Sequence, residues 1–197
     1  GEEMGIQSKK LGVHFNFAPV LDINTNPKNP IIGNRSFGEN RENVTQKALA
    51  FVKGMQSQHV LSNAKHFPGH GDTATDSHKA LPILDFDFER LDSIELYPYK
   101  KLINNNLTSV MVAHLSVIGL EENKDCPTSL SYQVITELLK EKLNFEGLIL
   151  TDALNMKGVS NYSDLGEINL EALLAGNDML LIPTDVPLAT ANIKIAL

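Results

Sequence analysis

Strand-length apolar runs alternate with helix-length segments along this 197-residue chain. Runs such as TSVMVAH and GLILT are apolar almost throughout, which is typical of parallel strands with both faces buried. The segments between them repeat their apolar residues at helical spacing. The sequence therefore predicts five successive β/α units. The expected strands span 13–22, 61–66, 108–114, 147–151 and 179–182, and the expected helices span 41–58, 89–105 with a bend at Pro98, 131–143 and 165–175, followed by a partial helix.

Two architectures contain such units, a doubly wound sheet and a TIM-type (β/α)₈ barrel. Polar residues end almost every expected strand, namely Asp22, Lys65 with His66, His114 and Asp152. Barrel active sites are built from these strand ends, and no G-x-G-x-x-G or Walker pattern follows any strand. We therefore predict an α/β fold of the barrel type.

A complete barrel takes about 250 residues, and both ends of this chain fall within helical patterns. We therefore expect a single partial barrel domain over residues 1–197 that carries about the last five β/α units of a longer protein. An unclosed barrel exposes sheet edges, so we expect this chain by itself to be poorly active or inactive.

The composition argues against some classes of function. A net charge of −7 without any Lys/Arg cluster argues against a nucleic-acid partner. No apolar stretch approaches the roughly 20 residues that cross a bilayer. The single Cys126 excludes a disulfide within the chain.

The segment from Lys65 to His78 holds three of the six histidines and two aspartates. Pro68 lacks a backbone donor and the two glycines favour unusual backbone angles, so neither a helix nor a strand can continue through it. The sequence therefore predicts a rigid loop at the end of a strand, with imidazole and carboxylate groups close together. Such a loop suits proton transfer or metal binding.

Asp152 and the pair Asp76 and His78 are the leading catalytic candidates. Asp152 directly follows a buried strand and would face the barrel mouth, although it could instead cap the next helix. Asp76 could accept the Nδ1 proton of His78, which leaves Nε2 to exchange protons with a substrate. An Asp-x-His pair in a loop also occurs by chance.

Lys65, His66 and Arg35 are candidates for substrate binding. Lysine is rarely buried without a partner, so Lys65 at a strand end indicates a hydroxyl- or anion-binding role or an ion pair with a neighbouring carboxylate. Arg35 lies in a long loop after the first expected strand, where it could bind substrate or hold the loop by hydrogen bonds. His114 is more readily explained as a hydrogen-bonded structural histidine.

A metal site is the competing interpretation of these strand ends, because barrel hydrolases bind zinc with strand-end histidines and aspartates. The close-spaced patterns that place two ligands on one metal are absent. We therefore expect neither a metal nor another cofactor. The residues that such a site would draw on are His66, His70, Asp72, Asp76, His78, His114 and Asp152.

The stretch KHFPGHGDTATDSH followed by LILTDALNMKGV resembles the catalytic barrel of glycoside hydrolase family 3. It is most similar to the bacterial β-N-acetylglucosaminidase branch that acts on peptidoglycan fragments. The similarity continues through NFAPVLDINTNPKNPIIGNRSFG, ELYPYKK, VMVAH, NFEGLILTDALNM and AGNDMLLIP, in the order of the family.

This resemblance implies a retaining mechanism without a cofactor. Asp152 matches the nucleophile, and His78 with Asp76 matches the acid/base dyad of this branch. Arg35, Lys65 and His66 match residues that hold the hydroxyls and the acetamido side of the sugar. An acidic sugar-binding residue of the family lies upstream of the matched segments and is not in this chain.

The resemblance leaves several alternatives open. A family 3 β-glucosidase or xylosidase, a GlcNAc phosphorylase, a metal-dependent barrel hydrolase and a degenerate binding barrel remain as rivals. The expected partner is a GlcNAc-containing glycan, together with the remaining barrel strands and a further C-terminal domain in the longer protein. The cytoplasm and the bacterial cell envelope both remain open as locations.

Overall fold

The computed structural model describes residues 1–74, 80–163 and 165–196. Four strands form the central sheet in the order β1 (Phe15–Asn16), β2 (Leu61–Phe67), β4 (Ser109–Val112) and β6 (Leu148–Thr151). All three strand pairings are parallel. This confirms the predicted parallel α/β fold.

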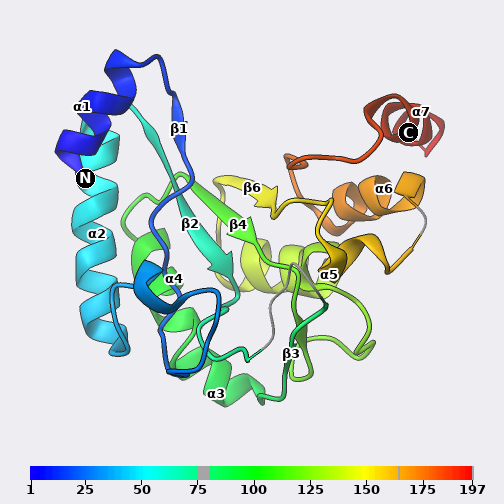
Figure 1. Cartoon of the computed structure of the whole chain (residues 1–197), viewed down its shortest axis with the longest axis horizontal. Helices are drawn as coiled ribbons and strands as arrows, with labels where there is room; N and C mark the ends of the chain where they lie inside the picture. The colour runs from blue at the N-terminus through cyan, green and yellow to red at the C-terminus, as the bar shows by residue number, and fades with distance from the viewer. Residues whose placement is uncertain (75–79, 164, 197) are drawn as a thin grey trace.

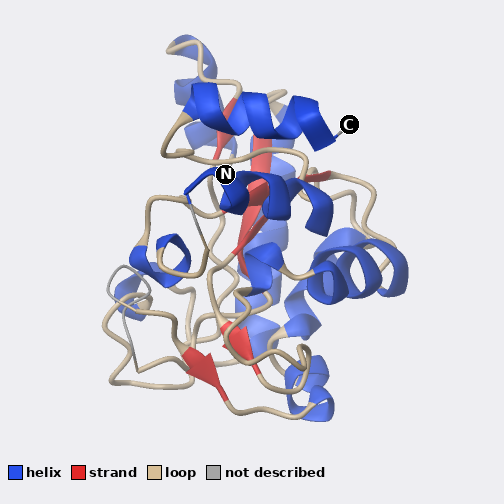
Figure 2. Ribbon diagram, turned by 90° about the vertical axis from the view of Figure 1, so that its right-hand side faces the viewer, coloured by secondary structure: helices blue, strands red, loops and turns tan. Residues whose placement is uncertain are grey.

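Helices connect and cover these strands (Figure 1). They are α1 (Glu2–Lys10), α2 (Arg41–Ser57), α3 (Phe88–Ser93), α4 (Leu96–Ile103), a π-helix (Gln133–Lys142), α5 (Lys157–Ser160), α6 (Leu165–Ala175) and α7 (Val186–Ala196), with 3₁₀ turns at Gly33–Arg35 and Thr128–Leu130. Two short strands, β3 (Ile83–Leu84) and β5 (Ser116–Val117), pair in parallel apart from the central sheet, as Figure 2 shows.

The first and last expected strands are shorter than predicted. Only Phe15–Asn16 pairs regularly in the first, because the N–H of Ala18 donates to Asn16 O instead of to β2 and Pro19 has no N–H to donate. The chain still follows β2 beyond that point, with a bridge between Val20 and Lys65. The last expected strand is reduced to a bridge between Met179 and Leu150.

The predicted helix 89–105 was wrong in its continuity and in the site of its bend. It is two helices that separate at Ile94 and Glu95, and Pro98 lies in the first turn of α4. Proline is tolerated there because the N–H groups of a first turn have no intrahelical partner. The predicted helix 131–143 is present over most of its length, but as a π-helix.

The main core lies between the strands and the helices α2, α4 and Gln133–Lys142. Phe67 of β2 meets Tyr99 of α4 edge to face, with ring centroids 5.0 Å apart. A smaller apolar cluster joins the segment after β6 to α6, and it contains Cys126, Leu130, Leu154, Val159, Ile168 and Ala172. The two cores fix the carboxyl ends of β2, β4 and β6 relative to one another.

Exposed apolar side chains gather near both edges of the central sheet. Val13 and Phe17 flank β1, and Met179 and Ile182 follow the β6 edge. Beyond them, α7 packs on α6 at the end of the molecule opposite α1 (Figure 1). The sheet does not close on itself within the described ranges, and closure into an eight-stranded barrel stays a prediction.

None of the helices in the described part of the chain combines the length and the apolar character that crossing a lipid bilayer requires.

Candidate functional site

The carboxyl ends of the strands surround a cavity of about 160 Å³. Four of the six predicted site residues line it, namely Arg35, Lys65, His66 and Asp152. The other lining residues are Phe17, Ile31, His70, Met111 and Leu181. The predicted residues Asp76 and His78 lie outside the described residues.

Asp152 immediately follows β6 and is half-buried. Its backbone N–H donates to Val112 O at 2.8 Å, which ties it to β4. Its Oδ1 accepts from the N–H of Ala153 at 2.8 Å. The next helix, α5, begins at Lys157 with Met156 in the N-cap position, so the alternative that Asp152 caps a helix was wrong.

Lys65 lies near the end of β2 and is half-buried. Burial lowers the pKa of its ammonium group, and the Arg35 guanidinium lowers it further, while Asp152 and Asp22 partly oppose both effects. Lys65 forms no ion pair with any residue in the described ranges. The cavity thus brings two cationic side chains close to the Asp152 carboxylate.

Asp22 was noted in the sequence as a polar residue at a strand end, but it was given no role in the site. Its side chain is fully enclosed behind the cavity wall, with 1% of the residue exposed. One carboxylate oxygen lies 2.7 Å from His66 Nδ1, and the other accepts from the backbone N–H groups of His66 at 3.3 Å and His70 at 2.7 Å. The only sequence signal was its position after an apolar run.

Burial by itself raises the pKa of the Asp22 carboxyl. The imidazoles of His66 and His70 and the hydrogen bonds from these residues outweigh burial, so the pKa lies below its ordinary value. Asp22 is therefore a buried, ionised carboxylate that accepts hydrogen bonds.

Arg35 ends a 3₁₀ turn in the loop that follows β1. Its Nη1 donates to Ile31 O at 3.3 Å, and its Nη2 lies 3.4 Å from His66 Nε2. The guanidinium thus helps to hold its own loop, as one alternative foresaw, and also lines the cavity.

The start of the His/Asp loop is fixed to the loop after β1. Asn29 Nδ2 donates to His70 O at 2.8 Å, and His70 Nδ1 lies 2.7 Å from Thr73 Oγ1. Burial lowers the pKa of the His70 imidazole. The described part of the loop, up to residue 74, is therefore well anchored beside the cavity.

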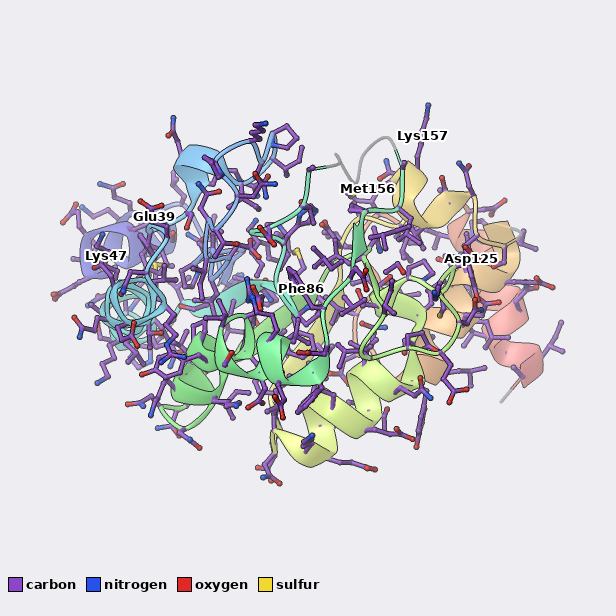
Figure 3. All side chains as sticks on the ribbon, turned by 90° about the horizontal axis from the view of Figure 1, so that it is seen from below. Glu39, Lys47, Phe86, Asp125, Met156 and Lys157 are labelled. Atoms are coloured by element: carbon purple, nitrogen blue, oxygen red, sulfur yellow. The ribbon has the colours of Figure 1, made fainter. Side chains whose placement is uncertain are left out.

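The loop also packs at Gly69 against Glu95, which forms an ion pair with Arg90. Arg90 Nη1 contacts both carboxylate oxygens of the buried Glu95 at 2.6 Å, and its guanidinium stacks over Phe86, which is labelled in Figure 3. A Cβ on Gly69 would lie only 2.7 Å from Glu95 Cγ. The loop leaves β2 in close contact with α4.

His114 follows β4 and is completely buried. Its Nε2 lies 3.0 Å from Ala153 O, and its Nδ1 lies 2.6 Å from Ser129 Oγ. Burial lowers the pKa of this imidazole. The structural interpretation of His114 is confirmed, and the residue it supports directly follows Asp152.

Within the described ranges, no group of three or more His, Cys, Asp or Glu side chains is arranged to hold a metal ion. The expected absence of a metal stays a prediction.

Known proteins are similar to this chain in sequence and fold. Residues 1–196 match the family described as the glycosyl hydrolase family 3 N-terminal domain. A beta-hexosaminidase of Methylococcus capsulatus is 39% identical over 194 residues, which cover 98% of this chain and 57% of that protein.

Two solved structures show the same arrangement. A family 3 β-N-acetylglucosaminidase from Paenibacillus sp. FPU-7 has a TM-score of 0.95 at 40% identity, over 98% of this chain and 37% of that one. A protein described as β-glucoside phosphorylase BglX also has a TM-score of 0.95, at 26% identity, over 100% of this chain and 37% of that one. This chain therefore spans only about a third to somewhat over half of these relatives. With the family match extending over residues 1–196, the chain belongs to glycoside hydrolase family 3.

Proposed function

We propose that the protein carrying this chain is a retaining exo-β-N-acetylglucosaminidase, which removes terminal GlcNAc from peptidoglycan fragments or chito-oligosaccharides. The observation that carries the proposal is the cavity that Asp152 lines together with Arg35, Lys65 and His66. Support comes from relatives at 39% and 40% identity that are named as a beta-hexosaminidase and a β-N-acetylglucosaminidase.

Asp152 is the proposed nucleophile. Its carboxylate attacks the anomeric carbon as the bond from that carbon to the leaving oxygen breaks, which gives a covalent glycosyl-enzyme. Lys65 and Arg35 line the same cavity as this carboxylate. The cavity volume of about 160 Å³ is below the roughly 300–1,000 Å³ of pockets for larger ligands, so it suits one sugar ring at a chain end.

The sugar-binding roles follow from the same geometry. Arg35 and Lys65 are hydrogen-bond donors without an acceptor atom, and they suit the hydroxyl and acetamido oxygens of GlcNAc. His66 also faces the cavity from the end of β2.

His78 with Asp76 is the proposed acid/base dyad. His78 donates a proton to the leaving oxygen in the first step and accepts one from water in the second, when Asp152 is released. Both lie outside the described residues, so this assignment rests on the Asp-x-His pattern. The anchored segment from Gly69 to Thr73 supports it, because it starts the same loop beside the cavity.

Phosphorolysis is the second candidate. A neutral histidine does not repel an anionic acceptor as a carboxylate would, so phosphate could replace water in the second step. The likeness to the structure described as a β-glucoside phosphorylase favours this variant and also keeps a glucoside substrate open.

The test compares an aryl β-N-acetylglucosaminide with the matching β-glucoside, using the full-length protein with and without phosphate. We expect preference for the GlcNAc substrate and loss of at least about a thousandfold in kcat for Asp152→Asn, since a neutral amide cannot act as the nucleophile. His78→Ala should impair a substrate with a poor leaving group far more than one with a good leaving group.

Glucoside preference would overturn the substrate assignment. Retained activity in Asp152→Asn would overturn the mechanism. A GlcNAc phosphate product that forms only when phosphate is present would replace hydrolysis by phosphorolysis.

A further inference from the structure

The buried carboxylate of Asp22 contacts one of the side chains that line the cavity. It lies behind His66, and His66 in turn lies behind Arg35, so that the three side chains form one hydrogen-bonded row that ends at the cavity. We propose that Asp22 is a positioning residue, which holds the His66 ring in its Nδ1–H tautomer and thereby fixes the Arg35 guanidinium at the cavity wall.

The chemistry of the two partners determines the tautomer. An ionised carboxylate only accepts, so the short contact of 2.7 Å between Asp22 Oδ2 and His66 Nδ1 requires a proton on Nδ1. A guanidinium only donates, so the contact of 3.4 Å between Arg35 Nη2 and His66 Nε2 requires a lone pair on Nε2. Both conditions are met by one neutral form of the ring.

The Asp22 carboxylate and the His66 ring are largely shielded from water, since only 1% of Asp22 and 5% of His66 are exposed, whereas Arg35 is exposed. Solvent therefore does not compete with Asp22 for His66 Nδ1. Without the acceptor at Nε2, the Arg35 side chain keeps only one hydrogen bond to the described residues, the one to Ile31 O at 3.3 Å. The orientation of a cation that faces the cavity thus depends on a carboxylate that does not.

Asp22→Asn separates this role from simple packing. The amide has the same shape, and its oxygen can still accept from the backbone N–H groups of His66 and His70. Its nitrogen then donates to His66 Nδ1, which forces the ring proton onto Nε2. The N–H of His66 Nε2 would then face the N–H groups of the Arg35 guanidinium, and the guanidinium would move away from His66.

The first measurement is the tautomer of His66, read from the ¹⁵N spectrum of histidine side chains in the full-length protein. His66→Gln assigns the signals. We expect Nδ1–H in the unchanged protein and Nε2–H in Asp22→Asn. Asn63→Ala is the matched control, because Asn63 is also buried on β2 but bonds Ser109, and it should leave the tautomer unchanged. An Nε2–H or doubly protonated ring in the unchanged protein overturns the proposal without any variant.

The second measurement is inhibition by free GlcNAc, and this part rests on the proposed function. Asp22→Asn should weaken GlcNAc binding about tenfold to a hundredfold, the range expected for a hydrogen bond to a charged group. Arg35→Ala should weaken it similarly, and the double variant should bind no worse than Arg35→Ala alone.

Unchanged GlcNAc binding in Asp22→Asn, or effects that multiply in the double variant, would overturn the link from Asp22 to Arg35. If the tautomer switches as expected but GlcNAc does not inhibit even the unchanged protein, the role of Asp22 stands and the proposed substrate fails.

Discussion

At the scale of single residues, the buried histidines His66 and His114 have different roles near the cavity. His66 presents one face to the cavity, while His114 turns both nitrogens to the protein. Because a carbonyl oxygen only accepts, His114 Nε2 carries the proton and donates to Ala153 O, and Nδ1 accepts from the Ser129 hydroxyl. His114 thus steadies the turn that follows Asp152.

Substitutions of His114 and Ser129 should show that the two residues act as a unit. His114→Leu and Ser129→Ala should each lower the free energy of unfolding by about 1–3 kcal/mol, because each leaves a buried polar group unpaired. The double variant should lose less than the sum, since both substitutions remove the same hydrogen bond. Urea unfolding of the four proteins measures this, and strictly additive losses would show that the bond contributes nothing.

At the scale of elements, β2 and the loop after it carry the site. The strand was predicted over 61–66 and extends one residue further, to Phe67. The loop then turns at Gly69, whose φ of +145° lies in a region that disfavours side chains. Close contact with Glu95 adds a second reason for glycine here.

Gly69→Ala should therefore be costly for two reasons at once. We expect a loss of about 2–4 kcal/mol in unfolding free energy, because backbone strain adds to a contact that forces neighbouring atoms to move. Gly12→Ala is the matched control, since Gly12 has a φ of +74° but no heavy atom within 4 Å of the added Cβ. It should lose only about 1 kcal/mol. Similar losses in both variants, measured by urea unfolding, would mean that the Glu95 contact is unimportant.

At the scale of the whole molecule, burial of neutral histidines makes stability depend on pH. Burial is the main cause that lowers the pKa of both His70 and His114. In the unfolded chain these rings take up protons near pH 6.5, while the folded protein resists protonation until lower pH. The unfolded state therefore binds more protons below about pH 6.5, and stability falls as the pH falls.

We expect the unfolding free energy to decrease from about pH 6.5 downwards by up to about 1.4 kcal/mol per pH unit for each of these histidines. His114→Gln should reduce the slope. His14→Gln should not, because His14 is exposed in the folded protein as well as in the unfolded chain. Urea unfolding at several pH values measures the slopes, and identical slopes in all three proteins would contradict this account.

The sequence by itself determined the parallel α/β fold and four of the residues that line the cavity. Both depend on local patterns, because a strand buried on both faces must be apolar throughout and the polar residue at its end stands out. The roles of Asp76 and His78 stay a prediction.

Only the tertiary structure decided which strand ends meet and what lies behind them. Asp22 and His66 are 44 residues apart in the chain, and nothing local distinguishes a carboxylate that caps a helix from one that holds an imidazole. The same limit applies to the break between α3 and α4, which falls at Ile94 rather than Pro98. Hydrogen-bond partners and helix ends are set by what packs around them, and that information lies in distant parts of the chain.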